Sequence, residues 1–418
     1  MRAMARWLVA WEAGGYLGHE MLVTAAALQL RAAGHEVQVC APRRVPPNRA
    51  ALQAGIGWIP MPDEAAPPAP ATGVRWKSRA TSLWGFGFHS ADWVRERVHH
   101  WSEVLAREAP DGVVLQAAPY AQLAARAAGV PSLEFGIGFD VPPRLSPFPP
   151  MRQPEAFTPE AGRAFEERLL EALPPAAPRE AATRERTTLA ARVSGDRRLV
   201  VSLPELDHYA GIVEPSRVFI GPLPPVDLGG EIVVWQRGEQ RTLEEHAVPG
   251  LRLLAYVRAS AVDVPAFLAA LAEVVGNGGE AIVVCPGASD DHAVLAQRLG
   301  VRFHQSPVSL AGVLPGADLV VCHGGGLMGE ALVQGRPCVA MPIHHEQFMA
   351  SSAMVRHRLG VMIDPRASAL FAPAWRHVLS DADLRANAAA LALRRGELAA
   401  QSGAAFVAAA QALLHLDA

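Results

Sequence analysis

The stretch from residue 318 to residue 347, DLVVCHGGGLMGEALVQGRPCVAMPIHHEQ, most limits how this chain can fold. The apolar run from Asp318 to Cys322 is typical of a fully buried parallel strand. His323 and three glycines follow, and residues from 327 onward take up helical spacing. A strand, a glycine turn and a helix bring backbone N–H groups and a positive helix end together. This pattern predicts an anion site, and a phosphate is its natural ligand.

A second strand follows this helix and ends in polar residues. Gly335 and Pro337 end the helix, and residues 338–342 are again apolar. Residues 344–347, HHEQ, come directly afterwards. Ligands of open α/β sheets bind at the carboxyl ends of the strands. The two strand ends therefore offer donors for a phosphate and side chains for hydroxyl groups, which is the inventory that a sugar nucleotide requires.

The residues from His323 to Gly360 resemble the donor-binding signature of GT-B glycosyltransferases of the UDP-glycosyltransferase type, especially bacterial natural-product enzymes. The resemblance implies an α/β chain with two Rossmann-like domains that face each other across a cleft. It implies that the pyrophosphate is bound by the histidine and the glycine turn, namely His323, Gly324, Gly325, Gly326 and Leu327. It further implies that Glu330 binds the ribose hydroxyls and that Glu346 and Gln347 bind the sugar.

This stretch departs from the family pattern in one respect. Glu330 follows His323 by seven residues, whereas the family usually has eight. The glycine turn is therefore one residue short, and Leu327 stands where the family has a phosphate-binding hydroxyl.

The length and charge of the chain set wider limits. At 418 residues it suits two domains, and half of its residues are hydrophobic, so each domain can bury a core. We expect an acceptor-binding domain at 1–221, a linker at 222–250, a nucleotide-sugar domain at 251–395 and a C-terminal helix at 396–418 that packs back on the first domain. The alanine-rich tail itself, residues 384–416, predicts two helices.

Charge and cysteine content exclude several classes of protein. The net charge of −3 is spread without basic blocks, so no nucleic acid partner is expected. No run approaches the roughly 18 apolar residues of a membrane helix, and the first apolar run stops at Glu12, too early for a signal peptide. Four widely spaced cysteines in apolar runs indicate reduced core residues. We expect a cytoplasmic protein.

The N-terminal residues predict a strand, a glycine turn and a helix that starts at His19. The turn carries Gly14, Gly15 and Gly18, and a dinucleotide site for NADP is one interpretation. The spacing is GGxxG rather than GxGxxG, however, and two arginines rather than an acid follow the second strand. The turn also resembles the N-terminal loop of the same glycosyltransferase family, in which the histidine is the catalytic base.

A separate physical argument favours His19 as a base. The positive end of a helix favours a neutral imidazole, which can accept a proton from a sugar acceptor hydroxyl. The alternative is a histidine that only packs or caps the helix start. The resemblance places an aspartate that orients the base at the end of a later strand, where this chain has Gln116. A glutamine can fix the tautomer but carries no charge, so Glu134 or Asp140 substitutes for it, the base is weaker, or the acceptor is itself acidic.

The remaining candidates are less specific. Trp84 and Phe88 belong to an aromatic cluster that predicts either a core-facing set or an apolar acceptor pocket. Arg258 follows a strand beside the glycine turn, where it would neutralise a pyrophosphate or serve as an ordinary surface arginine. Similar proteins hold the nucleobase through backbone groups near the position of Val308. The sequence Asp381-x-Asp383 indicates a helix start rather than a metal site.

These patterns together predict an inverting glycosyltransferase that needs no metal and no cofactor other than its nucleotide-sugar substrate. The donor is expected to be a UDP- or dTDP-sugar and the acceptor a small apolar or aromatic molecule. Two alternatives stay open: a nucleotide-sugar epimerase or hydrolase on the same fold, and a non-catalytic partner protein that binds sugar nucleotides. The oligomeric state also stays open, with a homodimer among the alternatives.

Overall fold

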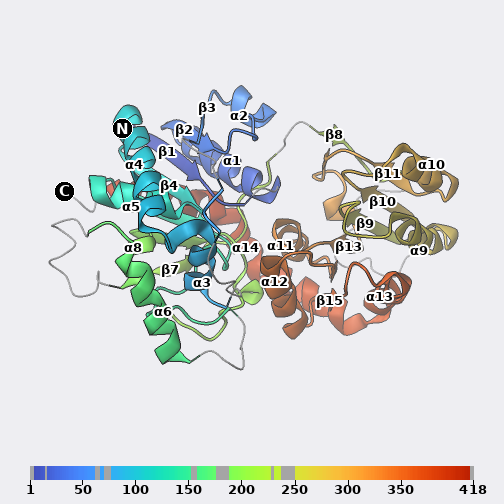
Figure 1. Cartoon of the computed structure of the whole chain (residues 1–418). Helices are drawn as coiled ribbons and strands as arrows, with labels where there is room; N and C mark the ends of the chain where they lie inside the picture. The colour runs from blue at the N-terminus through green and yellow to red at the C-terminus, as the bar shows by residue number, and fades with distance from the viewer. Residues whose placement is uncertain are drawn as a thin grey trace. The chain divides into compact units, whose positions relative to one another are not determined.

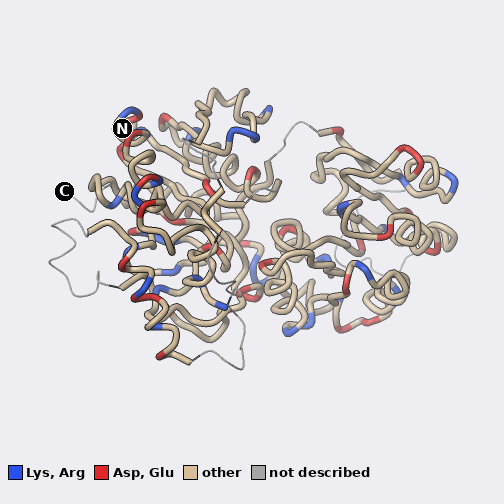
Figure 2. Tube along the Cα trace, in the orientation of Figure 1, with Lys and Arg blue, Asp and Glu red and all other residues tan. Residues whose placement is uncertain are grey.

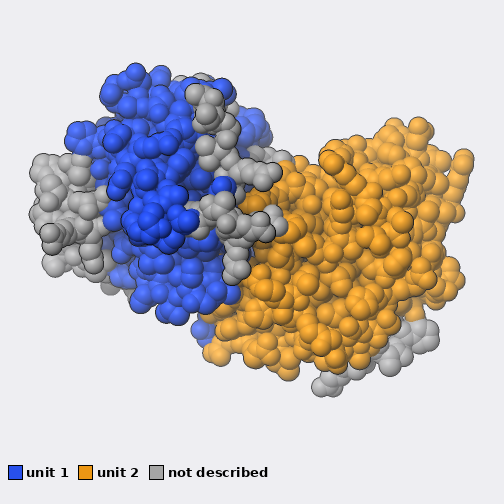
Figure 3. All heavy atoms as spheres, turned by 60° about the horizontal axis from the view of Figure 1, so that its bottom comes forward, with its two compact units in different colours: residues 1–202, 208–226, 401–418 blue, residues 203–207, 227–400 orange. Residues whose placement is uncertain are grey.

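The computed structural model describes residues 4–14, 17–61, 66–69, 77–151, 158–175, 188–226, 230–236 and 250–414. The chain divides into two compact units, which Figure 3 colours separately. Unit 1 comprises residues 1–202, 208–226 and 401–418, and unit 2 comprises residues 203–207 and 227–400. Each unit is built on its own parallel sheet, and the elements of both are labelled in Figure 1.

Unit 1 contains a seven-stranded parallel sheet with the order β3-β2-β1-β4-β5-β6-β7. The strands are β1 (Arg6–Trp11), β2 (Glu36–Ala41), β3 (Gly57–Pro60), β4 (Gly112–Gln116), β5 (Ser132–Gly136), β6 (Arg197–Val200) and β7 (Arg217–Phe219). The chain leaves β1 toward β2 on one side and leaves β4 toward β5 on the other. Right-handed crossovers then place the following helices on opposite faces of the sheet. The junction of β1 and β4 is therefore a topological switch point, where sheets of this kind bind ligands.

The helices of unit 1 are α1 (Leu17–Ala32), α2 (Arg49–Gln53), α3 (Arg79–Leu83), α4 (Ala91–Glu108), α5 (Pro119–Ala128), α6 (Pro159–Glu171) and α8 (Leu189–Val193), with a wide turn η1 (Trp84–Phe88). Residue types that favour helix starts and helix ends occur at the ends of these helices. Ser90 accepts a hydrogen bond from the Trp93 N–H at the start of α4. Gly129 ends α5 with a φ of 70°, a conformation that suits glycine.

Unit 2 contains a six-stranded parallel sheet with the order β11-β10-β9-β13-β14-β15. The strands are β9 (Arg252–Tyr256), β10 (Glu280–Val284), β11 (Arg302–His304), β13 (Leu319–Cys322), β14 (Cys338–Ala340) and β15 (Gly360–Met362). The helices are α9 (Val264–Gly276), α10 (Asp290–Arg298), α11 (Gly326–Val333), α12 (His345–Arg356) and α13 (Phe371–Ser380), with short turns η3 (Pro204–Leu206), η4 (Leu314–Gly316) and η5 (Ser368–Leu370). The strand order reverses between β9 and β13, so this sheet has a switch point of its own.

Part of the stretch predicted as a linker is packed onto unit 2. Strand β8 (Glu231–Ile232) pairs in parallel with β12 (Val308–Ser309). The indole N–H of Trp235 donates to the carbonyl of Val313 at 2.8 Å. Residues 222–226 belong to unit 1, and residues 227–229 and 237–249 of the predicted linker lie outside the described residues.

The C-terminal tail is one helix, α14 (Ala382–Leu414), where the sequence predicted two. Gly403 lies inside this helix and has a packing reason, because a Cβ there would lie 2.3 Å from the Gln29 side-chain oxygen. From residue 401 onward the tail belongs to unit 1. There Phe406 packs edge-to-face on Phe135 with ring centroids 5.4 Å apart, and Ser402 donates to the carbonyl of Pro222 at 2.7 Å.

The spread of charged residues and the burial of the cysteines agree with what the sequence predicts. Figure 2 shows acidic and basic residues interspersed along the trace of both units. The four cysteines are buried thiols. Among the described residues, no helix combines the length and the apolar character needed to cross a bilayer.

Candidate functional site

The switch point of the first sheet brings His19 and Gln116 together. Trp11 ends β1 and pairs in register with Gln116, which ends β4. His19 is the third residue of α1, and its Nδ1 lies 3.0 Å from Oε1 of Gln116, which is fully buried. The Trp11 ring stacks on the imidazole with centroids 5.8 Å apart. The ring is thus fixed on one side by an aromatic face and at Nδ1 by an amide oxygen.

Gly14 lies directly against the edge of the His19 ring that carries Nε2. It adopts a φ of 90°, and a Cβ added there would lie 2.2 Å from Nε2 of His19. A side chain at residue 14 would therefore collide with the imidazole and displace it from its place beside Gln116. Gly18 has no such constraint, since a Cβ there would meet nothing within 4 Å. Gly15, the remaining glycine predicted for this loop, lies outside the described residues.

The two carboxylates considered as substitutes for the missing aspartate differ in position. Asp140 Oδ2 lies 3.4 Å from Nε2 of Gln116, so it is the next group behind the amide. Glu134 instead accepts hydrogen bonds from Arg198 Nε at 3.1 Å and from the Gly195 N–H at 3.2 Å. Glu134 is therefore part of a separate buried network, and Asp140 is the carboxylate that reaches the His19 pair.

The aromatic pair predicted for an acceptor pocket lies at the core of unit 1. Phe88 is fully buried and stacks on Tyr120 with centroids 4.8 Å apart. Trp84 is partly exposed and packs against this core, with its ring 5.2 Å from that of Phe165. The geometry of Phe88 fits the core interpretation, and Trp84 is the member of the pair with exposed surface.

The switch point of the second sheet holds His323. Cys322 ends β13 and pairs with Tyr256 at the end of β9. His323 Nδ1 lies 2.7 Å from the carbonyl of Met341, just beyond β14, and Nε2 accepts from the Arg258 N–H at 2.9 Å. Burial lowers the pKa of His323, although the bond to Met341 opposes the change. The neutral ring therefore connects the ends of β9, β13 and β14 through hydrogen bonds.

His323 and Gly324 both have partners within the chain in this geometry. Neither ring nitrogen of His323 is left to donate to an anion, because both are bonded to the backbone. The N–H of Gly324 is directed at the sulfur of Cys322. The capacity to bind an anion thus rests with the first N–H groups of α11, which have no partner within a helix.

The glycine turn has the backbone that only glycine adopts without strain. Gly324 has a φ of 98° and Gly325, the residue before α11, a φ of 75°. A Cβ at Gly324 would also lie 2.9 Å from the Ser351 hydroxyl. Gly326 and Leu327 form the first turn of α11, and the Leu327 side chain packs against the core. Leu327 can therefore contribute to an anion site through its backbone N–H but not through its side chain.

Glu330 lies on α11 with its carboxylate unpaired among the described residues. Burial raises the pKa of Glu330 to about 7. A buried carboxylate without donors favours its protonated form until donors arrive. The sugar hydroxyls of a nucleoside are donors of the kind that this carboxylate lacks.

The other residues predicted for the donor lie at neighbouring strand ends of unit 2. Gln347 accepts at Oε1 from the Ile343 N–H at 3.0 Å, which leaves its amide N–H groups available. Glu346 belongs to the first turn of α12, which begins at His345. Burial lowers the pKa of His344, and the Arg258 charge acts in the same direction. Val308 is part of β12 and pairs with β8.

Several solved structures that this chain resembles are glycosyltransferases. CalG4, the calicheamicin glycosyltransferase, is 18% identical with a TM-score of 0.66, and the match covers 100% of both chains. The glycotransferase of kitacinnamycin is 18% identical with a TM-score of 0.63 and covers 99% of this chain and 98% of its own. SsfS6 of Streptomyces sp. SF2575, complexed with thymidine diphosphate, is 20% identical with a TM-score of 0.57 over 97% and 98% of the two chains. No protein-family model and no curated protein matches this sequence.

This chain has the GT-B fold.

The sequence predicted the candidate site residues at the strand ends of this GT-B fold. It did not predict the residues that hold them in position. Trp11 was not predicted, although its position as the last residue of β1 is a usable signal, since strand ends meet at a switch point. Asp140 was only one of two alternatives. It comes from a loop after β5, and nothing in its spacing indicates that it lies behind Gln116.

Proposed function

We propose that this chain is an inverting, metal-independent glycosyltransferase that transfers a sugar from a UDP- or dTDP-sugar to a hydroxyl of a small apolar or aromatic acceptor. The observation that carries the proposal is the hydrogen bond between His19 Nδ1 and the Gln116 oxygen. An amide oxygen only accepts, so Nδ1 carries the proton and Nε2 is a base. The resemblance of the fold to glycosyltransferases, one of them complexed with thymidine diphosphate, supports the proposal.

The proposed reaction is a single in-line displacement. His19 Nε2 takes the proton of the acceptor hydroxyl as its oxygen attacks the anomeric carbon, and the bond from that carbon to the diphosphate breaks. The electron pair of this bond leaves with the diphosphate. One displacement reverses the configuration at the carbon. The N–H groups at the start of α11 and the Arg258 charge stabilise the leaving diphosphate, so the neutralisation needs no metal ion.

Glu330 gives the proposal a test that does not depend on the acceptor. Its pKa of about 7 means that the protonated form is well populated at neutral pH. Ribose hydroxyls that donate to the carboxylate favour the ionised form, so nucleotide binding should release a proton. We expect the binding enthalpy of UDP or dTDP at pH 7 to change with the ionisation enthalpy of the buffer. Isothermal titration calorimetry in two buffers measures this.

The matched variants are E330Q and E273Q. E330Q should weaken nucleotide binding by about tenfold or more and remove the buffer dependence, because the lost contact is a hydrogen bond to a charged group. E273Q changes an exposed acid on α9, so it should behave like the wild type. Nucleotide binding with no buffer dependence would contradict the role of Glu330. Absence of any nucleotide binding would contradict the proposed function itself.

A further inference from the structure

A continuous chain of buried polar groups leads away from His19. Its Nδ1 meets Oε1 of Gln116 at 3.0 Å, and Nε2 of Gln116 lies 3.4 Å from Oδ2 of Asp140. Gln116 is fully buried and Asp140 is 5% exposed. No water is needed to connect the three side chains. The amide of Gln116 is the only group between the imidazole and the carboxylate along this path.

The Asp140 carboxylate, at one end of this series of hydrogen-bonded groups, determines which atom of each group donates and which accepts. An ionised carboxylate only accepts hydrogen bonds, so the NH₂ group of Gln116 must face Asp140. The amide oxygen then faces His19, Nδ1 must carry the proton, and Nε2 keeps its lone pair. With a neutral group at residue 140, either orientation of the amide would be satisfied. The amide therefore transmits to His19 an orientation that it cannot impose by itself.

Burial and the charged groups around Asp140 act together on its ionisation. Burial raises its pKa, and the charge of Glu134 acts in the same direction. The charges of His19 and Arg79 oppose this change, and the Ile137 backbone does so through a hydrogen bond. Arg79, on α3, is 5% exposed. Because the His19 charge favours an ionised Asp140, the carboxylate is best stabilised when the imidazole has taken up a proton.

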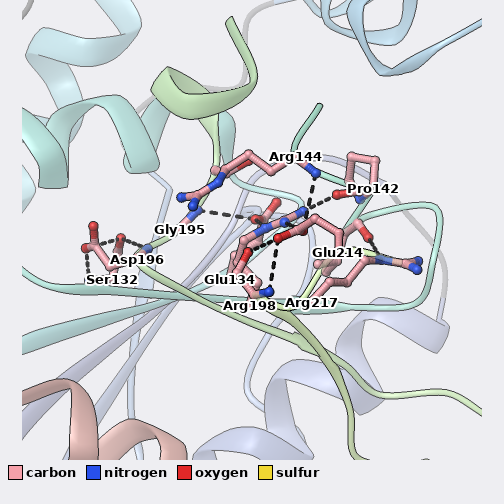
Figure 4. A network of polar contacts seen from close by, with 12 residues as sticks. Ser132, Glu134, Pro142, Arg144, Gly195, Asp196, Arg198, Glu214 and Arg217 are labelled. Carbon is pink, nitrogen blue, oxygen red and sulfur yellow. Dashed lines mark hydrogen bonds and ion pairs between the residues drawn. The ribbon is translucent and has the colours of Figure 1, made fainter. Parts of the chain in front are cut away.

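The loop that carries Asp140 is held by the buried network drawn in Figure 4. Arg198, which is 1% exposed, donates to Glu134, Glu214 and the carbonyl of Pro142. Arg217 Nε donates to the carbonyl of Val141 at 2.6 Å. The residues on the C-terminal side of Asp140 are therefore tied to β6 and β7.

Two further contacts fix the same loop. The Arg144 N–H donates to Glu214 at 3.3 Å, which closes the network on the far side of the loop (Figure 4). At the near side, a Cβ on Gly136 would lie 2.7 Å from Oδ2 of Asp140. Only a glycine at the end of β5 thus leaves room for the carboxylate behind Gln116. The position of Asp140 is set by the fold around it rather than by its contact with Gln116 alone.

We infer that Asp140 is a positioning residue for His19, which it orients and supports electrostatically through the Gln116 amide, and that the Arg198 network serves to hold its loop in place. Its role in catalysis rests on the proposed function, whereas its effect on the imidazole does not. A pair of exchanges separates this role from a purely structural one. D140N removes the carboxylate charge, and with it the fixed order of donors and acceptors between residue 140 and His19. Q116E puts a carboxylate directly against Nδ1 of His19.

The first experiment is ¹⁵N NMR of histidine-labelled protein without substrate. The His19 signal is found among the 15 histidines by comparison with H19A. In the wild type and in the Q116E/D140N double variant we expect the form with the proton on Nδ1, and in D140N a mixture of both forms. E166Q is the matched control, because Glu166 is 2% exposed and its hydrogen bonds go to Ser146 and Phe148 instead. E166Q should leave the His19 signal unchanged.

The second experiment compares the kinetics of the same variants. D140N should lower kcat by about tenfold with the KM for the sugar nucleotide unchanged, because only the orientation and charge support of the base are lost. Q116E alone places two carboxylates together, so one takes a proton and kcat falls as well. The double variant should regain kcat to within about threefold of the wild type. This mutual rescue is not expected of a residue that only stabilises the fold.

These outcomes distinguish the positioning role of Asp140 from the proposed sugar-transfer function. An unchanged His19 signal in D140N, or a double variant no better than D140N in both experiments, would overturn the positioning role. A wild type with the expected NMR signal that transfers no sugar would overturn the proposed function and leave the positioning role supported.

Discussion

Replacing His19 by alanine should lower the rate of sugar transfer at least about 100-fold while the affinity for the nucleotide stays the same. Nδ1 of the imidazole contacts the Gln116 oxygen, so Nε2 is the nitrogen whose lone pair can accept the proton. Without it, the acceptor hydroxyl must attack before it loses its proton. Nucleotide binding is unaffected because the predicted donor residues belong to unit 2 and His19 to unit 1. Steady-state rates and calorimetric affinities of the same preparation measure both quantities.

A surface histidine provides the control for this substitution. His99, on α4, has a side chain that is 69% exposed, and its contact in this structure is with Glu103 one helical turn away. H99A should keep both the rate and the affinity of the wild type. Turnover by H19A at the wild-type rate would contradict the assignment of the base.

Replacing Arg198 by methionine should lower the free energy of unfolding by about 3–5 kcal/mol. The guanidinium is 1% exposed and pairs with Glu134 and Glu214, whose side chains are 11% and 12% exposed. Removal of the cation leaves two largely buried carboxylates and the Pro142 carbonyl without their donor. Urea unfolding followed by circular dichroism measures the change. R163M, which breaks an exposed pair with Glu160 on α6, should cost less than about 1 kcal/mol.

Neutralising the carboxylates should reverse much of this loss. In R198M/E134Q/E214Q no buried charge is left unpaired, so we expect at least about half of the lost stability to return. Burial raises the pKa of Glu214, but the Ser216 hydroxyl and the Arg198 charge hold it below its ordinary value. Its contribution to stability is thus present at neutral pH and is lost as the pH falls through the acid range. An R198M variant as stable as R163M would contradict the structural importance of the network.

Local sequence patterns predicted the strands and the glycine turns well. The apolar run before His323 is β13, and the glycine turn leads directly into α11. Gln116 ends β4 opposite the end of β1 because strands of a parallel sheet end at the same edge. Residues next to the ends of central strands could therefore be placed near each other from sequence alone.

The supports of the site could not be predicted, because they depend on contacts between distant segments. Asp140 lies behind Gln116 in a loop whose carbonyls accept hydrogen bonds from arginines of β6 and β7. The two ring nitrogens of His323 contact the backbone of Arg258 and Met341, which are far away in sequence. The tail is one helix, and the close approach of Gly403 to Gln29 is a reason for this glycine that a local pattern does not reveal.

Mass spectrometry of a transfer reaction tests the central claim most directly. The protein is incubated with UDP- and dTDP-sugars and a set of small apolar and aromatic acceptors that carry hydroxyl groups. The account predicts that an acceptor gains the mass of one sugar residue while an equal amount of nucleoside diphosphate appears, and that H19A shows neither change at a comparable rate. Nucleotide binding without a glycosylated product from any acceptor, or release of an altered free sugar in its place, would contradict it.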